Sequence, residues 1–94
     1  MSSDAYRQKV EAKLEGYQAK LDGARAKLKG ATADARLEAE KQINELQSKL
    51  TAAKAKAAKL ADAGEETWAN ITKDLDDKFA GITSAVKRFF SSSD

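Results

Sequence analysis

The last third of the chain carries an apolar stripe whose spacing admits one kind of secondary structure. Between residues 68 and 89, large apolar side chains recur at steps of three or four residues. This is the period of one face of an α-helix and not of a strand. The stripe consists of Trp68, Ile71, Leu75, Phe79, Ile82, Val86 and Phe89. We therefore predict an amphipathic helix near residues 65–90, whose apolar face must pack against a partner.

A second apolar register precedes this helix and offers that partner. From Tyr6 to Leu60, apolar residues again follow one another every three or four positions, and the chain contains no Pro. The mean step of about 3.6 residues is that of a straight α-helix, so little supercoiling is expected. The predicted packing residues of the second half are Ile43, Leu46, Leu50 and Leu60. The large side chains of the first half are Tyr6, Val10, Leu14, Tyr17, Leu21 and Leu28.

Gly64 is expected to separate the two registers. We predict a helix near residues 33–62 and a tight turn at 63–65, with Gly64 in the left-handed conformation that often follows a helix. Charge favours an antiparallel arrangement, because residues 48–61 hold four Lys and no acid, whereas residues 62–77 hold six acids and one Lys. Folding the chain at Gly64 lays these opposite charges side by side.

The first third of the chain leaves two all-α architectures open, each a single domain over residues 1–94 with frayed ends at 1–4 and 91–94. Glycines recur at positions 16, 23 and 30, and each weakens a helix by about 0.5–1 kcal/mol relative to Ala. A break near Gly30 gives a three-helix bundle. An unbroken helix gives a helical hairpin, with a long amphipathic helix and a shorter antiparallel C-terminal helix. We favour the unbroken helix because the apolar register crosses Gly30 without interruption.

The unbroken helix would extend beyond the end of its shorter partner. Its apolar stripe from Tyr6 to Leu28 would then face solvent, and contiguous exposed apolar surface in a soluble protein usually marks a contact with another molecule. We therefore predict self-association as an antiparallel homodimer, or contact with another helical protein, along this stripe.

Composition narrows the classes of function. The chain of 94 residues has neither His nor Cys, so disulfides and imidazole or thiolate chemistry are excluded. Asp74, Asp76 and Asp77 are neighbours, yet on a helix they point in different directions and form no acid/base pair. We predict no catalytic, cofactor-binding or metal-binding residues, and no enzyme. The absence of a long apolar segment predicts a cytoplasmic protein, and the net charge of +2 argues against nucleic acid as a partner.

Two segments of the chain resemble a known group of proteins. One is the Gly-free run ADARLEAEKQINELQSKLTAAKAKAAKL, and the other is Gly64-Glu65-Glu66-Thr67-Trp68 followed by an amphipathic helix that ends in basic and aromatic residues. Together they resemble small bacterial coiled-coil proteins that have no assigned activity. The resemblance implies long helices and assigns no activity, and the three early glycines depart from it.

Two hypotheses of function follow from these patterns. The first is a non-enzymatic structural or interaction protein that acts through its amphipathic helix faces, with a stress-linked role as one form. The second is a peripheral protein of lipid or granule surfaces, which opens at Gly64 and lays the apolar face of its last helix into the interface. The side chains that would enter such a surface are Trp68, Phe79, Phe89 and Phe90.

Overall fold

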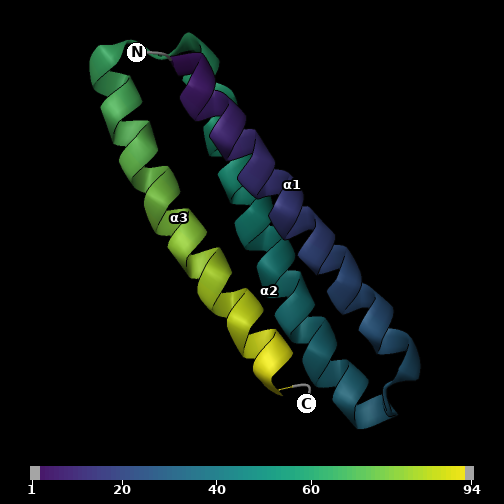
Figure 1. The fold of residues 1–94 in the computed structure, drawn as a ribbon. Helices are drawn as coiled ribbons and strands as arrows, with labels where there is room; N and C mark the ends of the chain where they lie inside the picture. Colours follow the sequence, from purple (N-terminus) through teal and green to yellow (C-terminus); the bar gives the residue numbers. More distant parts are fainter. Residues whose placement is uncertain (1–2, 93–94) are drawn as a thin grey trace.

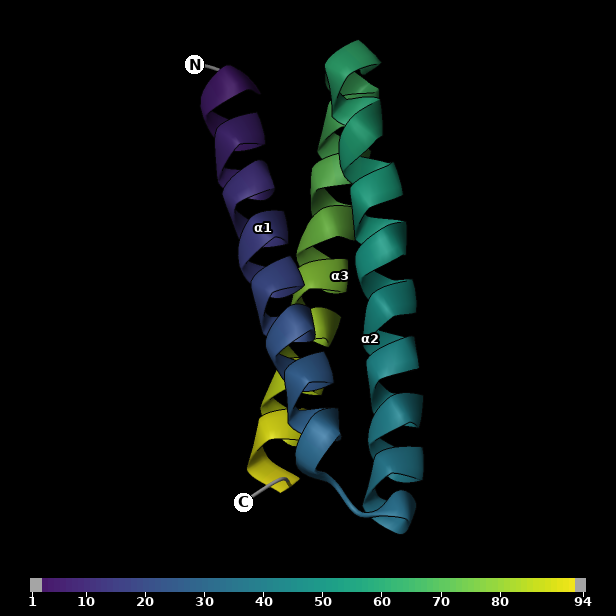
Figure 2. The same cartoon turned by 90° about the vertical axis from the view of Figure 1, so that its right-hand side faces the viewer.

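Three antiparallel α-helices form the protein in a computed structural model, which describes residues 3–92 (Figure 1). The helices are α1 (Ser3–Lys27), α2 (Ala33–Ala58) and α3 (Glu65–Ser92). Short 3₁₀ turns, Leu28–Gly30 and Lys59–Asp62, close the ends of α1 and α2. The three helices lie side by side over most of their length, as Figure 2 shows from a second direction. The result is an elongated three-helix bundle that measures 49 × 18 × 17 Å.

The predicted long helix is wrong, because the chain turns back between α1 and α2. Ala31 (φ −88°, ψ 151°) and Thr32 (φ −68°, ψ 165°) are both extended. The Ala35 N–H donates to Thr32 Oγ1 at 3.3 Å, which makes Thr32 the N-cap of α2. The Arg36 guanidinium donates to the Leu28 carbonyl at 3.0 Å. These local bonds satisfy backbone groups that a continuous helix would otherwise pair, and the break near Gly30 is the correct alternative.

The second turn lies where the sequence predicts it, between α2 and α3. Its conformation differs from the prediction, because no described glycine has a positive φ. The chain instead tightens into a 3₁₀ turn, with the Ala63 N–H donating to the Leu60 carbonyl at 3.3 Å. Ala63 is extended (φ −79°, ψ 136°), and the Trp68 N–H then donates to the Gly64 carbonyl at 2.7 Å. A left-handed glycine is therefore unnecessary for this reversal.

A continuous apolar core runs along the bundle axis between the three helices. Leu21, Leu50, Leu75 and Ile82 are its largest fully buried side chains. The other buried residues are Val10, Ala24, Ile43, Leu46, Ala53, Leu60, Ile71, Phe79, Val86 and Phe89. At roughly 25 cal/mol for each Å² of apolar surface removed from water, this burial is the main favourable term in folding. Among the described residues, the one large apolar side chain left exposed is Leu37, at 67%.

Helix extends into both segments that were predicted to fray. α1 begins at Ser3, and α3 ends at Ser92. The remaining parts of that prediction, residues 1–2 and 93–94, lie outside the described residues.

Candidate interaction surfaces

The predicted packing residues of α3 all face the core. Ile71, Leu75, Phe79, Ile82, Val86 and Phe89 are buried, and Trp68 is partly buried against them. Their predicted counterparts, Ile43, Leu46, Leu50 and Leu60, are buried in the same cluster. α3 packs more extensively on α2 than on α1. The structure therefore brings together the two faces that sequence periodicity had paired.

The stripe assigned to a dimer contact is covered within the chain. Val10 and Leu21 are buried, and Tyr6, Leu14, Tyr17 and Leu28 are partly buried against the core. The predicted exposure of this stripe is wrong, because α1 folds back and places it on α2 and α3. The dimer itself stays a prediction, since only one copy of the chain is present.

Two aromatic pairs join α1 to α3. The rings of Tyr6 and Trp68 lie 5.4 Å apart at 63°, and those of Tyr17 and Phe79 lie 5.7 Å apart at 41°. The hydroxyl oxygens of Tyr17 and Thr83 lie 2.9 Å apart and are hydrogen bonded. Sequence reasoning missed the Tyr17–Thr83 bond, because a contact across 66 residues leaves no local signal.

Two lysines of α1 also reach over aromatic rings of α3. Lys13 Nζ lies 5.3 Å from the ring centre of Phe79, and Lys27 Nζ lies 4.9 Å from that of Phe90. At exposed sites such cation–π contacts contribute about 0.5–1 kcal/mol. They help to hold α1 on α3, and no sequence pattern predicted them.

Polar contacts between α1 and α2 lie on the outside of the bundle. Lys54 Nζ donates to Gln18 Oε1 at 3.0 Å, and Arg25 donates to Gln47 Oε1 at 2.8 Å. Both are exposed. Water competes for all four groups, so each contact contributes little to stability.

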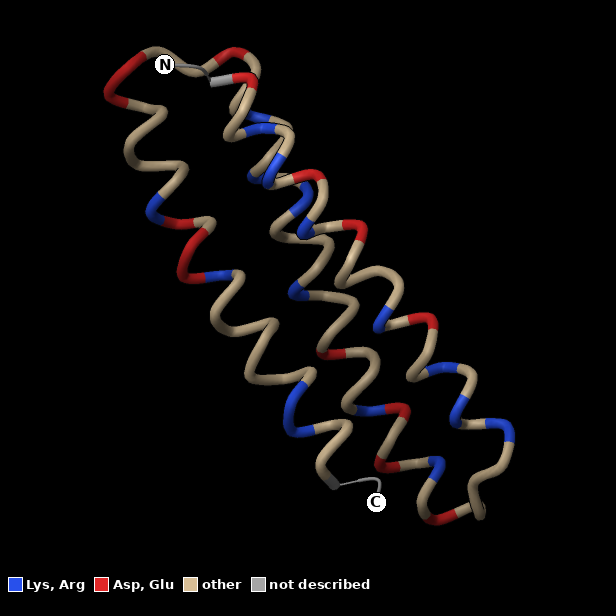
Figure 3. Tube along the Cα trace, in the orientation of Figure 1, with Lys and Arg blue, Asp and Glu red and all other residues tan. Residues whose placement is uncertain are grey.

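The predicted charge pairing between α2 and α3 is present at Asp74. Lys56 Nζ lies 3.0 Å from one carboxylate oxygen, and Lys78 Nζ lies 3.5 Å from the other. The hydrogen bond from Lys56, with the charges of both lysines, lowers the pKa of Asp74. Figure 3 shows acidic positions of α3 alongside basic positions of its neighbours. The pKa of Tyr6 is raised instead, mainly because its hydroxyl is partly buried and to a smaller extent because of the negative charge of Asp76.

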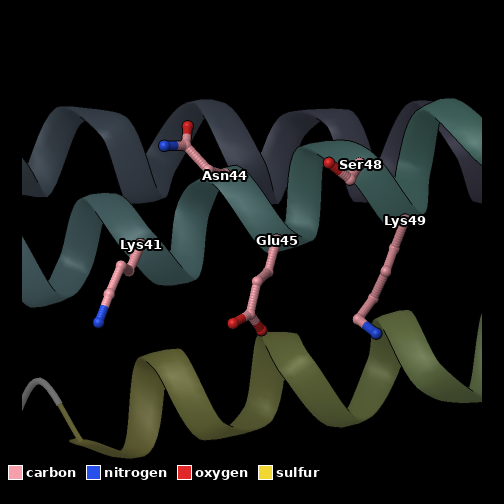
Figure 4. A pocket seen from close by; sticks show the side chains of 5 residues that line it. All are labelled: Lys41, Asn44, Glu45, Ser48 and Lys49. Carbon is pink, nitrogen blue, oxygen red and sulfur yellow. The ribbon is translucent and has the colours of Figure 1, made fainter.

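Open grooves on the surface have mixed charge. The largest of those described, about 480 Å³, lies beside α2. Figure 4 shows Lys41, Glu45 and Lys49 extending toward α3, while Asn44 and Ser48 point the other way. The single acid lies one helical turn from each lysine, so the groove does not present a uniform field to an anion.

A narrower groove, about 240 Å³, separates the first half of α1 from the end of α2. Val10 and Leu14 line one side of it, and Ala57, Ala58 and Ala61 line the other. The small alanine side chains do not fill the space beside α1. A small surface void therefore lies between α1 and α2 at this end.

Over residues 3–92, acidic side chains do not gather into a group of three or more that could hold a metal ion. In the same part of the chain, no helix is both long enough and apolar enough to cross a membrane. Comparison of the chain with protein-family models, curated proteins and solved structures finds no match.

Proposed function

We propose that this is a non-enzymatic interaction protein, whose α1 moves aside so that the apolar faces of α2 and α3 can bind another amphipathic helix. The observation that carries the proposal is the unequal share of the core. Of the fourteen buried residues in the described part of the chain, α1 contributes only Val10, Leu21 and Ala24. Without α1, the remaining two helices would still share most of the core. A groove between two helices is a common binding site for a third.

The sequence of α1 makes it the weakest helix of the bundle. Gly16 and Gly23 lie in its interior, and each lowers helix stability by about 0.5–1 kcal/mol relative to Ala. A Cβ added at either position would meet nothing within 4 Å. These glycines therefore gain no close packing in return. α1 carries two interior glycines, whereas α3 has one, Gly81, and α2 has none, so the cost is largest in the helix whose release would expose the groove.

Residue types support a role without catalysis. Nucleophilic and acid/base catalysis need a nucleophile and a base within hydrogen-bonding distance. The chain has no His or Cys, and the carboxylate of Asp74 is engaged by Lys56 and Lys78. These observations support binding through helix faces rather than catalysis.

Native-state hydrogen exchange of the full chain tests the proposal. Amides of α1 are expected to exchange through an opening that requires less free energy than the opening of α2 and α3. If α1 amides exchange only with global unfolding, as those of α2 and α3 do, the groove never opens alone and the proposal is wrong.

A lipid surface is a second candidate, favoured by the end of α3. Exposed Lys87 and Arg88 adjoin Phe89 and Phe90 there, the order of basic and aromatic residues found in interfacial helices. Trp68 fluorescence separates the two candidates. Vesicles of neutral or anionic lipid should shift the emission to the blue and protect Trp68 from quenchers if α3 enters the surface. Protection that is already present in buffer, and that vesicles do not change, would exclude lipid insertion.

A further inference from the structure

The turn between α1 and α2 is a short hinge whose sequence suits a helix as well as a turn. Only Ala31 and Thr32 lie between the 3₁₀ turn and α2. The chain has no Pro, and no described residue has a positive φ, so nothing in the hinge prevents a continuous helix. The apolar positions Leu28, Ala31 and Ala35 also keep helical spacing across it.

We propose that two copies of this chain exchange α1, forming a domain-swapped dimer in which residues 3–58 of each copy become one continuous helix. The inference rests on the proposed function, because it names a second copy as the occupant of the α2–α3 groove. In the dimer, α1 of one copy makes the same contacts with its partner that it makes in the closed bundle. The pairs Tyr6–Trp68 and Tyr17–Thr83 then form between copies. Exchange therefore sacrifices no core packing.

Local interactions at the hinge nearly balance between the two forms. The closed turn has the N-cap bond from Ala35 to Thr32 and the bond from Arg36 to Leu28. The continuous helix loses both, and places Gly30 in a helix interior where it is unfavourable. In return, the residues around the hinge gain the i to i−4 backbone bonds of an α-helix. Chain concentration then decides which form is populated.

Polar pairs between α1 and α2 locate the symmetry axis of the dimer. The pairs Gln18–Lys54 and Arg25–Gln47 are both centred on residue 36. Two continuous helices in this register cross there, about a two-fold axis. The apolar positions that continue the core register past this axis are Ala31, Ala35 and Ala39, whose small side chains allow close approach. Each helix would be about 84 Å long, so the dimer is far more elongated than the 49 Å bundle.

Cross-linking of the full chain distinguishes the two forms. The chain has no Cys, so a variant with Gln18→Cys and Lys54→Cys places two unique thiols where α1 touches α2. A short bis-maleimide joins them within one chain in the closed bundle and between chains in the swapped dimer. On a denaturing gel, covalent dimer is expected to increase as the protein concentration is raised from micromolar toward millimolar. Cross-links that stay within one chain at every concentration would overturn the proposal.

Proline at position 33 blocks the swap while preserving the closed bundle. Ala33 is the first residue of α2. Pro is favoured at this position because the backbone N–H that it lacks would make no hydrogen bond within the helix. Thr32 before it is already extended, as the residue before Pro prefers. Inside a continuous helix the same Pro is strongly unfavourable, so Ala33→Pro should lower the dimerisation constant at least about 100-fold. The melting temperature of the monomer should not fall.

Glu65→Pro is the matched control, because Glu65 is the first residue of α3 at the other turn and the α1 hinge is untouched. It should leave dimer formation unchanged. Thr32→Ala acts in the opposite direction, because loss of the N-cap weakens only the closed turn. Loss of this cap should favour the open form of one hinge about fivefold. The dimer contains two hinges, so its association constant should rise roughly 25-fold.

Two outcomes separate failure of the swap from failure of the proposed function. Inter-chain cross-links that persist undiminished in Ala33→Pro mean that closed bundles associate, which overturns the swap alone. Hydrogen exchange that shows α1 leaving only on global unfolding overturns the proposed function as well.

Discussion

The hydroxyl of Tyr17 on α1 and that of Thr83 on α3 lie 2.9 Å apart and join the two helices that share least contact. The Tyr17 ring also packs 5.7 Å from that of Phe79, and its hydroxyl lies 3.5 Å from the Phe79 carbonyl. Tyr17 therefore combines an apolar and a polar contact at one point of the α1–α3 boundary.

Removal of either hydroxyl should weaken this boundary. Tyr17→Phe and Thr83→Val are each expected to lower the free energy of unfolding by about 0.5 kcal/mol, the lower end for a hydrogen bond, because this bond is exposed and water competes for both hydroxyls. A double-mutant cycle by urea unfolding measures their coupling. The double variant should lose less than the sum of the two single losses, whereas strictly additive losses would mean that the two hydroxyls do not interact in solution.

Replacing the glycines inside α1 should stabilise the bundle. Gly16→Ala and Gly23→Ala are each expected to raise the free energy of unfolding by about 0.5–1 kcal/mol, since an added methyl group meets no neighbour. Thermal unfolding followed by circular dichroism provides the measurement. Ala26→Gly, at an exposed position of the same helix, is the matched control and should destabilise by a similar amount. Unchanged or lower stability in both Ala variants would show that α1 contributes nothing as a helix.

Periodicity predicted the core well, and failed at the α1–α2 turn for a physical reason. Positions such as Leu50, Leu75 and Ile82 follow from helical spacing, because burial of one face needs only that pattern. The same spacing continues through Ala31 and Ala35, where the chain turns. Periodicity therefore could not separate a turn from a helix there.

A helix-capping signal in the sequence could have predicted that turn. Thr32, followed two residues later by Asp34, has the composition of a helix start, and the structure uses Thr32 in this way. The contacts of Tyr17 with Thr83 and of Lys13 with Phe79 could not be predicted, because they depend on how α1 sits on α3 once the chain has turned.

Stability should depend on acid pH through Asp74. Its pKa is lowered from the ordinary value of 3.8 by the hydrogen bond from Lys56 and by the charges of Lys56 and Lys78. A carboxyl group whose pKa is lower in the folded than in the unfolded chain stabilises the folded state above pH 3.8. This contribution is lost as the pH falls through the folded-state pKa. The urea midpoint of Asp74→Asn should lie below that of the unchanged chain at pH 7. The gap should close as the pH falls below the folded-state pKa of Asp74, where both side chains are neutral.

A second variant tests whether Lys56 is the partner of Asp74 that causes this pH dependence. Lys56→Met removes the nearer lysine, 3.0 Å from the carboxylate, so Asp74→Asn should have a smaller effect in that background. An equal effect in both backgrounds would assign the stabilisation to Lys78 or to another source.

Trp68 should contribute more to stability than its partial burial suggests, because its ring meets Tyr6 edge-on at 5.4 Å and packs against the core at the start of α3. Trp68→Ala is expected to lower the free energy of unfolding by about 2–3 kcal/mol, somewhat less than the ~3–5 kcal/mol typical of a fully buried Trp. Trp68→Phe keeps an aromatic partner for Tyr6 and should recover about half of that loss. Leu37→Ala is the control, because Leu37 is 67% exposed and its removal should change stability by less than about 0.5 kcal/mol. Urea unfolding followed by circular dichroism compares all three without needing the indole as a probe. If Trp68→Ala proves as neutral as Leu37→Ala, the end of α1 does not rest on α3 in solution, and the pairing of Tyr6 with Trp68 is wrong.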